Sequence, residues 1–96
     1  MTQPNQSASS LRFMVALSFE SGHEAEIAAL IPQEQAHIRG LIQRGAVETI
    51  YISADRSLIW LIMRGASRQE VEQALTYLPL YPYMRPVVTR LANLAL

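Results

Sequence analysis

The sequence predicts an α+β fold in which two helices cover one face of a four-stranded antiparallel sheet. Three observations support this prediction: four segments have strand character, two have the apolar spacing of helices, and they follow one another in the order β-α-β-β-α-β. A chain of 96 residues suits a single small domain. Residues 1–10 are polar and predict a flexible tail, so we expect residues 11–96 to form the domain.

The first half of the domain is predicted to be a strand followed by a helical region. Residues 11–19 alternate large apolar side chains with smaller or polar ones, which is the period of a strand. Residues 23–44 repeat apolar side chains at helical spacings, and Gly45 is typical of a helix end. Pro32 lies inside this region, which is either one kinked helix or two helices; we expect Pro32 to begin a second helix.

The second half is predicted to begin with a β-hairpin and a helix. Residues 47–54 and 58–63 are rich in β-branched and aromatic side chains, and the polar triplet between them predicts a tight turn. Ser67 and Glu70 have the spacing of a capping box, which predicts the start of the second helix at Ser67.

Residues 83–91 predict the last strand, and Pro86 places this strand at an edge of the sheet or in a bulge. The complete order of elements is that of the ferredoxin-like fold.

Both faces of the predicted sheet carry apolar residues. Residues 58–63 are apolar at six consecutive positions, and Met14 and Ala16 lie at the centre of the first strand, between its large apolar residues. The helices cover one face, and a large apolar patch is rarely left in water. We therefore expect the other face to pack against the same face of a second copy, as a homodimer or higher homo-oligomer of the dimeric α+β barrel type.

The composition argues against several classes of function. Eight arginines, no lysine and eight acidic residues give a net charge of zero with scattered basic groups, which argues against binding of nucleic acid or of a membrane surface. The chain has no cysteine, and its two histidines lack metal-ligand spacing, so we expect no metal site. The N-terminal residues lack the pattern of a signal peptide, so we expect a cytoplasmic protein.

Glu34 lies in the middle of the apolar stripe of the first helical region. At about 100° per residue, the stripe falls within roughly 60° of one direction, which Glu34 shares. The stripe consists of Ile27, Ile31, Ile38, Leu41 and Ile42. Loss of water around a carboxyl raises its pKa towards the range useful for general acid or base catalysis. Two structural alternatives stay open: Glu34 pairs with an arginine such as Arg64 or Arg85, or it is a first-turn residue of a helix that Pro32 begins.

Several other side chains are candidates for the same site. His37 lies one helical turn after Glu34 and could exchange a proton with it, although a half-exposed surface histidine is the alternative. Tyr81 and Tyr83, in a proline-rich string before the last strand, could offer hydroxyl groups at the mouth of a pocket or belong to a stiff connector. Tyr51, in a predicted strand, is either a ligand contact or a core or interface residue.

The string Leu-Pro-Leu-Tyr-Pro-Tyr-Met at residues 78–84 resembles the Leu-Pro-Leu-Phe-Pro-Tyr-Met signature near the C-terminus of muconolactone isomerases. The resemblance extends without gaps over residues 11–92. It includes the helix-ending Gln43-Arg44-Gly45, Arg56 in the hairpin turn, and Glu34. Gln35 stands where the family has a lysine, which indicates a divergent member.

The resemblance implies a ferredoxin-like subunit, an oligomer, and a cofactor-free pocket between helix and sheet. We expect an isomerase-like enzyme of aromatic catabolism that moves a proton on a small, apolar, oxygenated ring compound such as an unsaturated lactone. Glu34 would be the general acid/base, while His37, Tyr83 or Arg56 steadies the enolate oxygen. The alternatives are a cofactor-less monooxygenase or cyclase of aromatic compounds, and a non-catalytic module that binds a small ligand.

Overall fold

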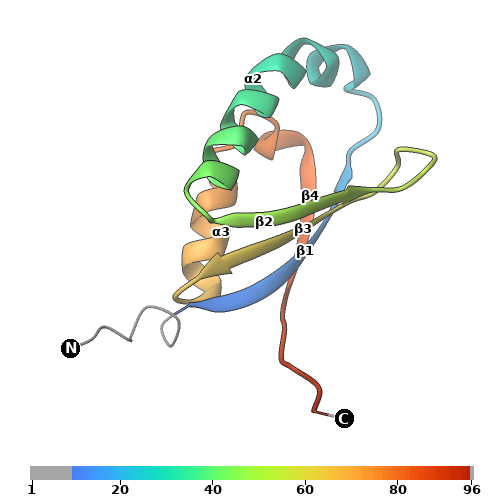
Figure 1. Cartoon of the computed structure of the whole chain (residues 1–96). Helices are drawn as coiled ribbons and strands as arrows, with labels where there is room; N and C mark the ends of the chain where they lie inside the picture. Colours follow the sequence, from blue (N-terminus) through green and yellow to red (C-terminus); the bar gives the residue numbers. More distant parts are fainter. Residues whose placement is uncertain (1–9, 96) are drawn as a thin grey trace.

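Four antiparallel strands form one sheet in the order β2-β3-β1-β4, and two helices lie on one of its faces (Figure 1). The computed structural model describes residues 10–95, so the predicted tail over residues 1–10 lies outside the described residues except for Ser10. The elements are β1 (Leu11–Phe19), α2 (Glu24–Gln43), β2 (Val47–Ile52), β3 (Ile59–Gly65), α3 (Arg68–Thr76), the 3₁₀ turn η1 (Tyr81–Tyr83) and β4 (Met84–Arg90). This arrangement confirms the predicted ferredoxin-like α+β fold.

The core lies between the helices and the sheet, and strand β1 shows why. Its residues Phe13, Val15 and Leu17 are buried and point towards the helices, because alternate side chains of a strand share a face. Across β1, Val15 pairs with Leu61 of β3 on one side and with Val88 of β4 on the other. Within residues 10–95, the two central strands supply five of the thirteen buried apolar side chains, and the helices, the edge strands and the loop after α3 supply the rest.

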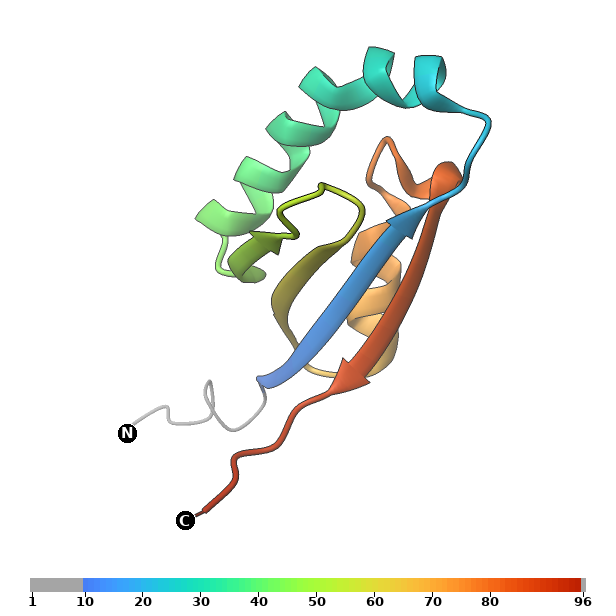
Figure 2. The same ribbon diagram turned by 90° about the vertical axis from the view of Figure 1, so that its right-hand side faces the viewer.

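Helix α2 is one continuous helix, and the prediction that Pro32 begins a second helix is wrong. A proline inside a helix removes one backbone hydrogen bond and crowds the carbonyl four residues earlier. Ile27 before Pro32 and Ile38 after it both pack against the core, so one helix keeps the apolar stripe on the sheet in spite of that cost. Figure 2 shows the result, a helix that curves over the upper end of the sheet. Within residues 10–95, no helix has both the length and the hydropathy that crossing a membrane requires.

The predicted end of α2 at Gly45 is confirmed. Gly45 has a φ of 79°, a conformation that favours glycine, and its N–H donates to the carbonyl of Ile42 at 3.0 Å. The N–H of Ala46 donates to the carbonyl of Leu41 at 2.9 Å. These two bonds satisfy carbonyls at the helix end and lead the chain directly into β2.

The predicted cap of α3 is also confirmed. The hydroxyl oxygen of Ser67 accepts the N–H of Glu70 at 3.1 Å, and the Glu70 carboxylate accepts the N–H of Ala66 at 2.7 Å. In a standard capping box the carboxylate would accept from Ser67 itself, so the return bond is displaced by one residue. Val71 and Leu75 follow as the buried residues of this helix.

Pro86 lies in β4, which is an edge strand of the sheet, as predicted. The other edge is β2. Its ladder with β3 is irregular between Val47 and Thr49, where a bulge changes which residues face the helices. Val47 is buried on the helix side before the bulge, and Ile50 and Ile52 take that side after it.

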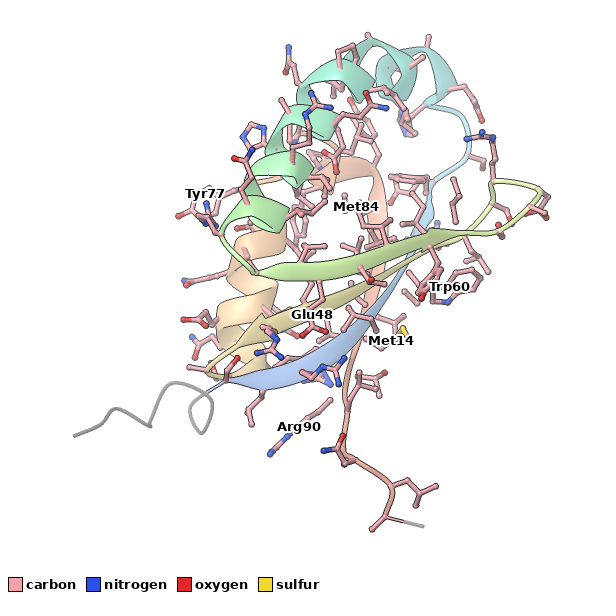
Figure 3. All side chains as sticks on the ribbon, in the orientation of Figure 1. Met14, Glu48, Trp60, Tyr77, Met84 and Arg90 are labelled. Atoms are coloured by element: carbon pink, nitrogen blue, oxygen red, sulfur yellow. The ribbon has the colours of Figure 1, made fainter. Side chains whose placement is uncertain are left out.

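The sheet face turned away from the helices, here called the open face, is apolar at its centre. On it, Met14 pairs with Ile62, and Ala16 lies between Trp60 and Val87. Figure 3 shows Met14 and Trp60 projecting away from the helices. At one end of this face, Glu48 bridges two arginines, Arg12 and Arg64. The prediction of apolar residues on both sheet faces is therefore confirmed for the subunit.

Replacement of Ser67 by alanine tests the cap of α3. We expect Ser67→Ala to lower the free energy of unfolding by about 1 kcal/mol, because the N–H of Glu70 loses its acceptor. Ser67→Thr keeps an acceptor and should restore most of the loss. Urea denaturation followed by circular dichroism measures both, and equal stability of Ser67→Ala and wild type would contradict the assigned cap.

Candidate active site

A cavity of about 520 Å³ lies between α2 and the sheet, within the size range of small-molecule sites. Its walls are mainly aliphatic. Helix α2 contributes Ile27, Ile31, Ile38 and Ile42, and the sheet contributes Leu17, Phe19, Ile50, Ile52, Ile59 and Leu61. The polar side chains of the lining are Glu34, Gln35 and Arg39 on α2 and Arg56 in the β2–β3 turn, and Leu80 completes it.

The isoleucine side chains that line this cavity do not fill its interior. Four of them, on facing elements, remain between 40% and 48% exposed. They are Ile31, Ile42, Ile50 and Ile52. Apolar side chains that face one another normally pack until little surface is left, so this surface is available to an apolar ligand.

Among residues 10–95, Glu34 is the only carboxylate that lines this cavity. It is half-buried, and one carboxylate oxygen, Oε1, accepts the backbone N–H of Leu80 at 3.0 Å. Loss of water around the group raises the pKa of Glu34, and the Leu80 N–H and the charge of His37 offset part of that rise. The carboxyl is thus shifted towards its neutral form and is held at a fixed point of the wall.

Neither structural alternative for Glu34 describes the molecule. Arg64 pairs with Glu48 on the open face, and Glu34 has no ion pair with Arg64, Arg85 or any other residue of the described range 10–95. Helix α2 begins at Glu24, so Glu34 is not a first-turn residue. The helical direction predicted for Glu34 does hold, because Ile27, Ile31 and Ile38 share the cavity with it.

Arg56 reaches the cavity from the turn between β2 and β3. Its φ of 65° lies in the left-handed region that non-glycine residues seldom adopt, so the turn must hold it there. Asp55 provides the hold: one of its oxygens accepts the Ser57 hydroxyl at 2.7 Å, the Ser57 N–H at 3.0 Å and the Ser53 hydroxyl at 2.7 Å. These bonds, those from Ser57 first, lower the pKa of Asp55 to about 2. Asp55 is therefore ionised and engaged within the turn.

His37 does not line the cavity with Glu34. It borders a separate depression with Tyr77 and Leu78, between α2 and the end of α3. Its ring nitrogen Nδ1 donates to the carbonyl of Gln33 at 3.1 Å, since a carbonyl can only accept. His37 acts on Glu34 only from outside the cavity lining, through its charge, which offsets part of the rise in the pKa of Glu34.

The three candidate tyrosines also lie outside the cavity. Tyr51 is on the open face and 63% exposed, because the bulge in β2 reverses the alternation that would have turned it inward. Tyr81 lines a different hollow between α3 and β4. Tyr83 packs against His23, with ring centroids 5.1 Å apart and the ring planes tilted by 43°. Of the six candidate residues, the structure brings only Glu34 and Arg56 together.

Sequence reasoning missed Arg39 as a residue of the site. Arg39 follows Ile31 by eight residues and Gln35 by four, so it continues one edge of the same helical stripe. This spacing could have identified it. The apolar stripe predicts only that residues at its centre line the cavity, whereas a long arginine side chain can reach the cavity from the edge of the stripe.

The site has the components for proton transfer. A carboxyl with a raised pKa stands in an aliphatic wall, and two guanidinium groups line the same cavity. No three His, Asp or Glu side chains of residues 10–95 are grouped so that they could hold a metal ion.

Comparison with known proteins identifies one family. A search of curated proteins finds no significant match. The model of one protein family, muconolactone delta-isomerase, matches residues 11–94, from the start of β1 to beyond the end of β4. The match confirms the resemblance carried by residues 78–84. The chain belongs to the muconolactone delta-isomerase family.

Proposed function

We propose that the protein is an isomerase that moves a proton on a small unsaturated lactone or a related oxygenated ring compound, with Glu34 as the general acid/base. Family membership indicates an isomerase-like or related small-molecule enzyme. The observation that carries the proposal is the position of Glu34, a carboxyl with a raised pKa in the wall of an apolar cavity. Such a carboxyl is suited to accept a proton and to return it.

Glu34 can carry the proton in both steps of the reaction. The ionised carboxylate accepts a proton from the carbon next to the lactone carbonyl, and the electron pair of that C–H bond moves into a conjugated enolate. The neutral carboxyl then returns the proton to the far carbon of the conjugated system, which shifts the double bond. The hydrogen bond from Leu80 fixes Oε1, so the other carboxylate oxygen can face both carbon atoms in turn.

Arg56 is the candidate for stabilising the enolate oxygen. It lines the cavity with Glu34, whereas His37 and Tyr83 do not. The bonds between Ser57 and Asp55 fix the turn that carries Arg56, and its guanidinium group offers donors to an oxygen that gains negative charge.

Activity of Glu34 variants tests the proposal. We expect the protein to isomerise a β,γ-unsaturated γ-lactone, such as α-angelica lactone, to its conjugated isomer, and Glu34→Gln to lower kcat by about 10² to 10⁴-fold. Ultraviolet absorbance follows the new conjugation, and NMR in D₂O follows proton exchange. Glu26→Gln, an exposed position of the same helix, is the control and should keep wild-type activity. Wild-type turnover by Glu34→Gln, or consumption of dioxygen in place of isomerisation, would contradict the mechanism.

The pH dependence of stability offers a test that needs no substrate. Because burial raises the pKa of Glu34, the folded protein pays a cost for the ionised carboxylate that grows as the pH rises through the raised pKa. Below the ordinary value of 4.5 the carboxyl is neutral in both states and the cost disappears. We expect Glu34→Gln to be more stable than wild type at pH 7 and equal to it at about pH 4, by urea denaturation. Equal stability of the two proteins at pH 7 would argue against desolvation of Glu34.

We further propose that two copies pack through the open face as a homodimer. The apolar residues at its centre are neighbours in the sheet, whereas ordinary surfaces carry apolar side chains singly. Val87, one of these residues, is 62% exposed. A second copy offers the same apolar centre, and a two-fold axis brings the two centres together.

Charge substitution on the open face tests the dimer. We expect Val87→Glu to convert the protein to a monomer, because two carboxylates would be buried in the apolar contact. Tyr77→Glu is the matched control, since Tyr77 is 77% exposed and lies just after α3, on the helix side of the molecule and away from Met14 and Trp60 (Figure 3). Light scattering after size-exclusion chromatography gives the mass of each. A wild-type monomer, or a dimer that Val87→Glu leaves intact, would contradict this contact.

A further inference from the structure

Arg39 has no partner that explains it within the described part of the chain. None of the ion pairs found among residues 10–95 includes it. Helix neighbours three and four residues away can pair with an arginine, but those of Arg39 are uncharged: Gln35, Ala36, Ile42 and Gln43. Arg68 on α3 shows the contrast, because it has Glu72 four residues on and pairs with it at 3.7 Å.

The cavity lining carries more basic than acidic side chains. Arg39 and Arg56 contribute two positive charges, and Glu34 is the only acidic side chain that residues 10–95 contribute to the lining. Asp55, next to Arg56, is engaged with Ser53 and Ser57 in the turn. The lining therefore carries a net positive charge whether Glu34 is ionised or neutral.

The position of Arg39 separates it from the proton-transfer residues. Glu34 and Arg39 are five residues apart on α2, which places them about 140° apart around the helix axis. Both residues line the same cavity. Because Glu34 lies near the centre of the apolar stripe of α2, this angle places Arg39 at the edge of that stripe. A ligand whose reactive carbon meets Glu34 would have room for a second group at Arg39, four residues after Gln35.

We propose that Arg39 is a specificity-determining residue that binds a carboxylate group on the ligand of the Glu34 cavity. A guanidinium group binds a planar carboxylate through two parallel hydrogen bonds, and the aliphatic walls accept the rest of the ligand. The inference rests on the proposed function only in treating the cavity as the ligand site. Arg39 places a cation in the cavity lining one helical turn beyond Gln35.

Binding of two probes of the same shape tests the proposal. Cinnamate carries a carboxylate and cinnamamide is its neutral counterpart, and isothermal titration calorimetry measures the affinity of both. We expect wild-type protein to prefer cinnamate, and Arg39→Gln to weaken cinnamate binding by about three- to tenfold without a change for cinnamamide. The preference of the wild type should also decrease as salt is added.

The control is Arg44→Gln, at the end of the same helix but outside the cavity lining, which should bind both probes as wild type does. The proposal is overturned if wild-type protein shows no preference for cinnamate, if Arg39→Gln keeps that preference, or if Arg44→Gln loses it equally.

Glu34→Gln separates this inference from the proposed function. This variant should lose turnover and still prefer cinnamate. If Glu34→Gln loses turnover and Arg39→Gln keeps the preference for cinnamate, the role of Arg39 alone is overturned. If Glu34→Gln keeps turnover and Arg39→Gln loses the preference for cinnamate, the role of Glu34 alone is overturned.

Discussion

Incomplete packing of α2 on the sheet is the constraint on which the site depends. Of the twenty residues of this helix only Leu41, near its C-terminal end, is buried. The Gly45 turn joins this end of the helix directly to β2. The isoleucines of the stripe then line a cavity instead of closing the core, and Glu34 becomes a cavity residue that loses water on one side only. A fully packed helix would have needed an apolar residue at position 34.

Much of the fold could be predicted from local sequence patterns because local physics determines it. The alternation of β1, the cap at Ser67 and the helix end at Gly45 each depend on a few neighbouring residues, and each is confirmed. Pro32 was the exception, because apolar packing on both sides of it outweighs a local preference for a helix start. The strength of that packing is a property of the whole sheet.

The site could be predicted only in part, for reasons of long-range geometry. Periodicity gave the direction of Glu34 but not the spacing between helix and sheet, which decides between a cavity and an arginine partner. A single bulge in β2 turned Tyr51 to the open face, and simple alternation does not reveal it. Arg39 was missed because reach, as well as direction, decides whether a long side chain lines a cavity.

The most direct test of the central claim is the pKa of Glu34 itself. NMR titration of the folded protein, labelled with ¹³C at the glutamate carboxyl carbons and assigned by comparison with Glu34→Gln, measures it without a substrate. Desolvation in the cavity predicts a midpoint above the ordinary value of 4.5. A midpoint at or below 4.5 would show that water or a positive charge reaches this carboxylate, and would contradict its assignment as the proton-transfer group.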